Sequence, residues 1–84
     1  MKKFLELVEK KIKDSIDLEN IKIIDNTHKH RKHKLFTEGR LHLCVEIESK
    51  FLKSLNRLTA QRMVMKILKE EMKSKIHALE IRII

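Results

Sequence analysis

The sequence predicts a single α+β domain over residues 1–84, ordered helix–strand–strand–helix–strand, with the helices packed on one face of a three-stranded sheet. Three observations predict this fold. Apolar residues recur at helical spacing near the start, residues 41–47 alternate between apolar and polar, and residues 76–83 alternate again after a second helical stretch. The length of 84 residues allows one modest core, and an apolar content of 42% is enough to fold it.

The first half of the chain is expected to form a helix and two strands. A helix is predicted over residues 3–16, with an apolar stripe of Leu5, Val8, Ile12 and Ile16. Residues 21–25 follow as a short strand rich in β-branched side chains. In the strand over 41–47, one side carries only apolar residues and the other carries His42, Cys44 and Glu46. The sheet should therefore have one covered face and one wetter face.

The second half is expected to form a helix and a final strand. Residues 50–58 fit either a turn or a short helix, and Thr59 is predicted to cap a helix that runs to about residue 73. The buried stripe of that helix is Ala60, Val64, Ile67, Leu68 and Met72. Glu70 and Glu71 are interpreted as solvated surface. The first two strands should pair antiparallel, and the last should join the sheet by a crossover through the helix.

Composition excludes several classes of protein. With one glycine and no proline, a glycine-rich phosphate loop is not expected, and no hydrolase or metalloprotease motif is present, so an enzyme is not predicted. No apolar run approaches the ~20 residues of a membrane span. Cys44 is the only cysteine and charge returns directly after the start, which favours a soluble protein of a reducing compartment over a secreted one. The net charge of +8 favours an acidic partner without selecting which kind.

The candidate ligands are histidines. His28, His30 and His33 lie in a polar loop over residues 26–40, close enough in sequence for two of them to bind one metal ion. The Lys and Arg residues between them disfavour a dication and favour an anionic group, and a merely solvated basic loop or a zinc site remains open.

His77 begins the last strand. By alternation it should share a side with Leu79, Ile81 and Ile83, where a lone histidine is more often a structural group than a ligand. Cys44, in the middle of its strand, reads as a structural thiol.

Four stretches of the sequence carry a family resemblance. They are residues 25–30 (Asp-Asn-Thr-His-Lys-His), Lys50-Phe51, the helix with Arg62-Met63-Val64, Leu68 and Glu70-Glu71-Met72, and Ile76-His77-Ala78-Leu79. Together they resemble the BolA family over nearly the whole chain, and the last motif, placed after the Glu-Glu helix, is the most specific. The resemblance implies a fold related to the class II KH topology.

The resemblance also implies a partner and a cofactor. BolA proteins pair with monothiol glutaredoxins of the Cys-Gly-Phe-Ser type, and the pair shares a 2Fe–2S cluster with glutathione. Carried over to this sequence, the invariant ligand is His77 and the loop ligand is His30, with His28 or His33 as alternates. No cofactor is expected in the isolated chain, which should be a monomer or weak homodimer in a bacterial cytoplasm or an organellar matrix.

A rival function follows from the same resemblance, since family members are described as transcriptional regulators. The residues expected to contact DNA are Arg62, Lys66, Lys69 and Lys73. The sequence departs from the family at Phe51-Leu52-Lys53 and Ala60-Gln61-Arg62, which bears on this surface. Many members also carry a histidine just before the second strand, where this chain has Arg40 or Leu41, with His42 close by.

Overall fold

The computed structural model describes residues 2–27 and 41–84 of the chain. In chain order its elements are α1 (Lys2–Ser15), β1 (Asn20–Asp25), β2 (Leu41–Glu48), α2 (Lys50–Lys53), α3 (Arg57–Ile67), α4 (Lys69–Ser74) and β3 (Ile76–Ile83). The predicted α+β class and the predicted strands are confirmed. No helix in the described part of the chain is both long and apolar enough to span a membrane.

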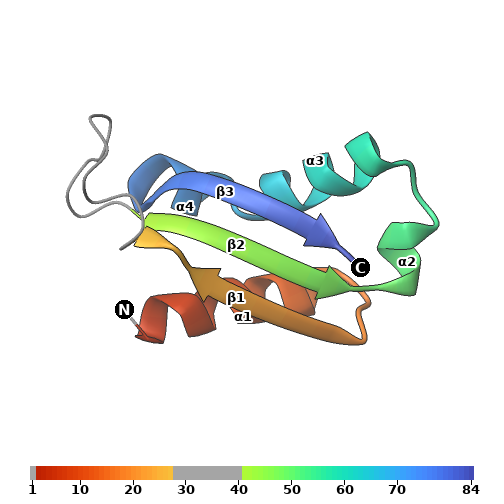
Figure 1. Ribbon diagram of the computed structural model, residues 1–84, viewed down its shortest axis with the longest axis horizontal. Coiled ribbons are helices and arrows are strands. Elements are labelled where there is room, and N and C mark those ends of the chain that lie inside the picture. The colour runs from red at the N-terminus through yellow and green to blue at the C-terminus, as the bar shows by residue number, and fades with distance from the viewer. Residues whose placement is uncertain (1, 28–40) are drawn as a thin grey trace.

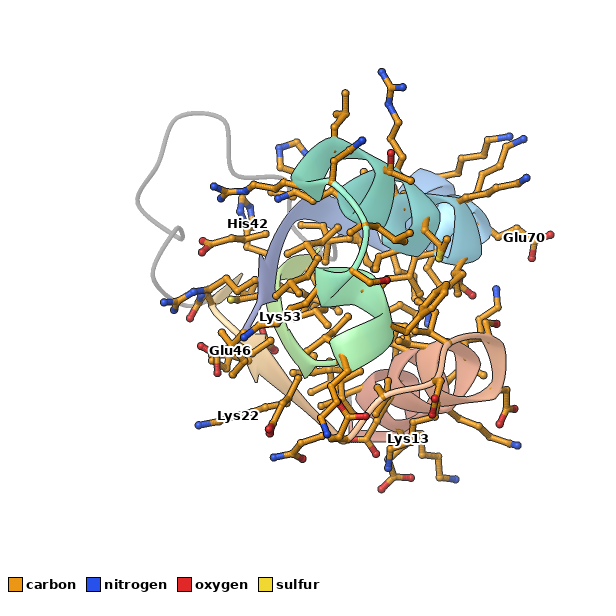
Figure 2. The ribbon with its side chains drawn as sticks, turned by 90° about the vertical axis from the view of Figure 1, so that its right-hand side faces the viewer. Lys13, Lys22, His42, Glu46, Lys53 and Glu70 are labelled. Carbon is orange, nitrogen blue, oxygen red and sulfur yellow. The ribbon has the colours of Figure 1, made fainter. Side chains whose placement is uncertain are left out.

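The sheet has the strand order β1-β2-β3, with β1 and β2 antiparallel and β2 and β3 parallel. This is the pairing that the alternating segments predict, because a parallel neighbour needs a crossover, here supplied by α2, α3 and α4. Figure 1 shows α1, α3 and α4 behind the sheet, all on one face. Within the described residues no helix covers the opposite face, here called the open face, and Figure 2 shows Lys22, His42 and Glu46 on that side.

The core lies between the sheet and the helices. Val8 and Ile12 of α1 and Ile16 directly after it are buried, as the predicted stripe requires. They pack with buried residues of the strands, of α2 and α3, and of the junction between α3 and α4 (Ile21, Val45, Ile47, Ile81, Leu52, Ala60, Val64 and Leu68). Each fully buried aliphatic side chain stabilises the fold by roughly 1.5–3 kcal/mol. A smaller cluster of Leu41, Leu43 and Ile76 extends the core toward the end of the sheet where β3 begins.

The helical region after β2 differs from the prediction in two ways. Thr59 does not cap the helix. Asn56 does, since its side-chain oxygen accepts from the backbone N–H of Thr59 at 2.8 Å, so α3 begins at Arg57. The helix is also not continuous, because the backbone leaves helical geometry at Leu68 and α4 begins at the next residue. The segment that fitted either a turn or a short helix contains the short helix α2, capped by Ser49.

Glu71 is buried, which corrects the prediction that both glutamates of the pair are solvated; Glu70 is exposed as expected. The ammonium group of Lys11 on α1 donates to both carboxylate oxygens of Glu71, each at 2.9 Å. The side chains are 35% and 10% exposed, respectively. This ion pair connects α1 to α4 at the back of the sheet.

Candidate functional site

His77 occupies a β-bulge at the start of β3. Leu41 pairs with Ile76 and His42 pairs with Ala78, so His77 is the extra residue on its strand. Such a residue shifts the alternation by one position, and the prediction that His77 shares a side with the apolar residues of β3 is therefore wrong. Ile76 is fully buried, whereas His77 is exposed. The bulge keeps the strand anchored in the core and presents the imidazole to solvent.

A second histidine lies beside it. The ring centroids of His42 and His77 are 5.1 Å apart and the ring planes are inclined by 53°. His42 is half-buried, on the open face of the sheet as predicted, and its Nε2 is buried. The sequence alone places His42 on the wetter side of its strand, close to a position where many family members carry a histidine, and does not single it out as a ligand. The signal that would have selected it is the parallel pairing of β2 with β3, which sets residue 42 opposite residue 78.

Hydrogen bonds hold the end of β1 next to this histidine pair. Asp25 accepts hydrogen bonds from the backbone N–H of Thr27 at 2.9 Å and from its hydroxyl. The hydroxyl oxygen of Thr27 accepts in turn from the backbone N–H of His42 at 3.2 Å, and the carbonyl of His42 accepts from the N–H of Asn26 at 2.8 Å. Thr27 is the last described residue before position 41, so both described flanks of the polar loop lie at the histidine pair.

The predicted loop ligands His28, His30 and His33 lie outside the described residues, and their role stays a prediction. Within residues 2–27 and 41–84, no group of three or more His, Cys, Asp and Glu side chains is placed to hold a metal ion. A cavity of about 220 Å³ opens beside His42, lined by Asn26, Leu43, Ala78, Leu79 and Glu80 as well.

Cys44 is buried although it points to the open face. Burial raises the pKa of its thiol, the carboxylates of Glu80 and Glu46 raise it further, and the guanidinium of Arg82 acts in the opposite direction. A thiol held protonated is a weak nucleophile and a weak metal ligand. The structure thus agrees with the structural interpretation of Cys44.

The candidate DNA-contacting residues are all on the outer surface. Arg62, Lys66, Lys69 and Lys73 are exposed along α3 and α4. The first turn of α3 carries no acidic residue. This surface is basic and accessible, as an anionic partner requires.

Comparison with known proteins identifies the family. The model of the BolA-like protein family matches residues 12–84, and the chain belongs to that family. Among solved structures, the fold is similar to the BolA domain of SufE1 from Arabidopsis thaliana, with a TM-score of 0.78 and 22% identity over 93% of this chain and 86% of that chain. It is also similar to BolA1 from Arabidopsis thaliana, with a TM-score of 0.76 and 24% identity over 93% of this chain and 86% of that one.

A bol-like protein from Babesia bovis gives a TM-score of 0.72 and 20% identity over 94% of this chain and 80% of that chain. At these identities the structural matches establish the fold. A search of curated protein sequences returned no match.

Proposed function

We propose that this BolA-like protein binds a monothiol glutaredoxin and shares a 2Fe–2S cluster with it, acting in iron–sulfur cluster handling or iron-linked regulation and catalysing no reaction itself. The observation that carries the proposal is the pairing of an exposed His77 with His42 at the loop end of the sheet, 5.1 Å between ring centroids. Exposure matters because the remaining ligands, a glutaredoxin cysteine and a glutathione thiol, must reach the site from outside.

The donor chemistry fits such a cluster. Neutral imidazoles replace thiolates on one iron of known 2Fe–2S centres, so a histidine contribution is chemically ordinary. Zinc–imidazole bonds, for comparison, are about 2.1 Å long. The centroid separation of 5.1 Å is of the size expected for two imidazoles on one metal centre. His77 is the first ligand in this proposal because its ring is exposed while its strand is anchored by the buried Ile76.

The second ligand comes either from the loop, as His30 with His28 or His33 as alternates, or from the sheet, as His42. His30 is the one that the family pattern implies, and it follows Thr27 by three residues, a span of at most about 11 Å of extended chain. His42 is the one that the structure brings next to His77. The visible spectrum of the shared cluster depends on the ligands of its iron atoms. The spectrum would therefore show whether His30 or His42 is the second ligand.

The test is to mix the apo-protein with cluster-loaded glutaredoxin and glutathione, and to follow visible circular dichroism and gel filtration. We expect a new spectrum and a heterodimer. His77→Ala should abolish the new spectrum, and whichever of His30→Ala and His42→Ala weakens or shifts it identifies the second ligand. Cys44→Ser is the matched control on the same strand as His42 and should leave the spectrum intact. An unchanged spectrum without a heterodimer would refute the proposal.

DNA binding is the second candidate, favoured by the exposure of Arg62, Lys66, Lys69 and Lys73 on adjoining helices. Simple charge attraction falls steeply as salt rises, whereas specific binding survives ~150 mM salt and prefers one sequence. Measuring binding to several DNA duplexes at two salt concentrations therefore distinguishes specific DNA binding from simple charge attraction. The proposal includes a reducing compartment, the bacterial cytoplasm or an organellar matrix.

A further inference from the structure

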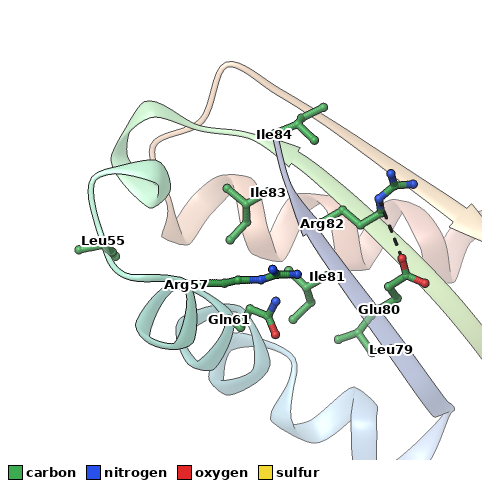
Figure 3. Close-up of a pocket in the computed structure, with 9 residues that line it drawn as sticks. All are labelled: Leu55, Arg57, Gln61, Leu79, Glu80, Ile81, Arg82, Ile83 and Ile84. Carbon is green, nitrogen blue, oxygen red and sulfur yellow. Dashed lines mark ion pairs between the residues drawn. The ribbon is translucent and has the colours of Figure 1, made fainter.

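A groove runs along the outer edge of β3, at the other end of the strand from the histidines. It has a volume of about 770 Å³, and Figure 3 shows its two sides, the strand from Leu79 to Ile84 and the start of α3 with Arg57 and Gln61. In the described sheet β3 pairs with β2 alone, so its other edge is not hydrogen-bonded to a strand.

The backbone groups at that edge can be assigned from one hydrogen bond. The N–H of Ile84 donates to the carbonyl of Ile47 at 2.9 Å and so points toward β2. Successive residues of a strand direct their backbone groups to opposite sides. The N–H and C=O groups of Leu79, Ile81 and Ile83 therefore point away from β2, into the groove. An edge of this kind is a template for another extended chain.

The floor of the groove along this edge is formed by apolar side chains. Leu79 and Ile83 are half-buried and Ile81 is buried, all three lining the groove. The groove side of α3 continues that surface, because Leu58 and Met65 lie on the same flank of the helix as Gln61 at helical spacing. Leu58 is 59% exposed and Met65 is 38% exposed, so this flank of the helix presents accessible apolar surface next to the groove.

Arg57 supplies a positive charge on the α3 side of the groove. Arg57 is exposed, lines the groove and has no ion-pair partner among the described residues, and α3 has no acidic residue in its first turn. Arg82 is also in the lining, but Glu46 at 3.1 Å and Glu80 at 4.0 Å already balance it. Of the two arginines that line the groove, Arg57 is therefore the one that is available to an anionic ligand.

We propose that this groove binds an extended acidic peptide segment of a partner protein, which adds to β3 as a further strand. Main-chain hydrogen bonds to residues 79, 81 and 83 would supply affinity, apolar side chains would enter the groove at every second position, and a carboxylate would pair with Arg57. This inference goes beyond the shared cluster and does not depend on it.

Two other occupants fit the observations less well. A nucleic-acid backbone offers acceptors for Arg57, but it cannot match alternating N–H and C=O groups at strand spacing, and the chain is poor in aromatic residues for base stacking, at 4%. A second copy of this chain would bring another +8 charge and another Arg57 to the same edge. An acidic peptide satisfies both the hydrogen-bond pattern and the charge.

The test titrates the ¹⁵N-labelled full chain with the synthetic peptide acetyl-Glu-Val-Glu-Val-Asp-Val-Glu-amide. We expect saturable shifts at Leu79, Ile81 and Ile83, and slower hydrogen exchange of those three amides only, because the amides of Glu80 and Arg82 already point to β2. The control peptide has the same composition with its valines grouped together, and it should bind at least about fivefold more weakly.

Arg57→Glu tests the charge without harming the helix, since an acidic residue in a first turn is favourable there. It should weaken peptide binding about fivefold or more, whereas Lys3→Glu, the same change of charge in the first turn of α1, should not. The proposal is overturned if the peptide gives no shifts at millimolar concentration. It is also overturned if single-stranded oligonucleotides alone shift these amides, or if the amides are protected by self-association without peptide.

Discussion

Removing either partner of the ion pair between Lys11 and Glu71 should destabilise the protein, but by unequal amounts. The carboxylate of Glu71 belongs to a side chain that is only 10% exposed, whereas the side chain of Lys11 is 35% exposed. In Glu71→Ala the ammonium group can turn to water, and the loss is mainly packing and a screened interaction, about 1 kcal/mol. In Lys11→Ala a nearly buried carboxylate loses its partner, which should cost about 2–3 kcal/mol, below the 3–5 kcal/mol of a fully buried pair.

The measurement is urea and thermal unfolding of both variants, followed by far-UV circular dichroism. For a domain of this size each 1 kcal/mol lowers Tm by roughly 4–8 °C, so Lys11→Ala should lose roughly 10 °C or more and Glu71→Ala about half of that. The control on the same helix is Lys10→Ala. The pair of Lys10 with Asp14 is exposed, and its loss should change stability by less than about 0.5 kcal/mol.

A double substitution separates charge burial from packing. Lys11→Met with Glu71→Leu replaces both charges by apolar groups of similar size, and it should fall within about 1 kcal/mol of the original protein. If Glu71→Ala costs as much as Lys11→Ala, the reasoning from unequal exposure is wrong. If the double substitution lowers the free energy of unfolding by more than the two alanine substitutions combined, the ion pair stabilises the protein by more than the desolvation of its two charges costs.

The remaining predictions concern the cap, the cysteine and the ligands. Asn56→Ala should cost about 1 kcal/mol in urea unfolding and Thr59→Ala close to nothing, because only the former removes the cap. Because burial raises the pKa of Cys44, iodoacetamide should alkylate this thiol slowly at neutral pH, and fast alkylation of the native protein would contradict this. The contribution of the protonated thiol to stability should be present below the pKa of the unfolded thiol, near ~8.5, and should be lost as pH rises through the folded pKa. Acidification should release the shared cluster reversibly, since imidazole binds metal only when neutral, and a cluster that persists at pH 4 would argue against His77 as a ligand.

Much of the fold could be predicted because its signals are local. The alternation at residues 41–47 and the stripe with Val8, Ile12 and Ile16 state directly which side of each element is buried, and the structure confirms them. The cap was misassigned because Asn56 and Thr59 both suit the position and lie within one turn. The choice between them depends on where the short helix α2 ends, which local pattern does not determine.

The errors at the site have a different origin, because they depend on contacts between distant segments. Glu71 is buried only because α1 brings Lys11 to it across 60 positions of sequence. His77 faces solvent only because β3 pairs with β2 through a bulge, and a bulge leaves no mark in an alternating sequence. The proximity of His42 to His77 follows from that same register.

The bulge also explains how one short strand can serve both stability and binding. Directly before it, the carbonyl of Lys75 accepts from the N–H of Leu41 at 2.7 Å, and Ile76 is fully buried, so the backbone entering His77 is held from the core side. Directly after it, Ala78 pairs with His42. A histidine fixed at both neighbours loses little backbone entropy when its ring binds, yet the ring is open to an approaching partner. A strand without the bulge would turn the same imidazole into the apolar side of the sheet, where no partner could reach it.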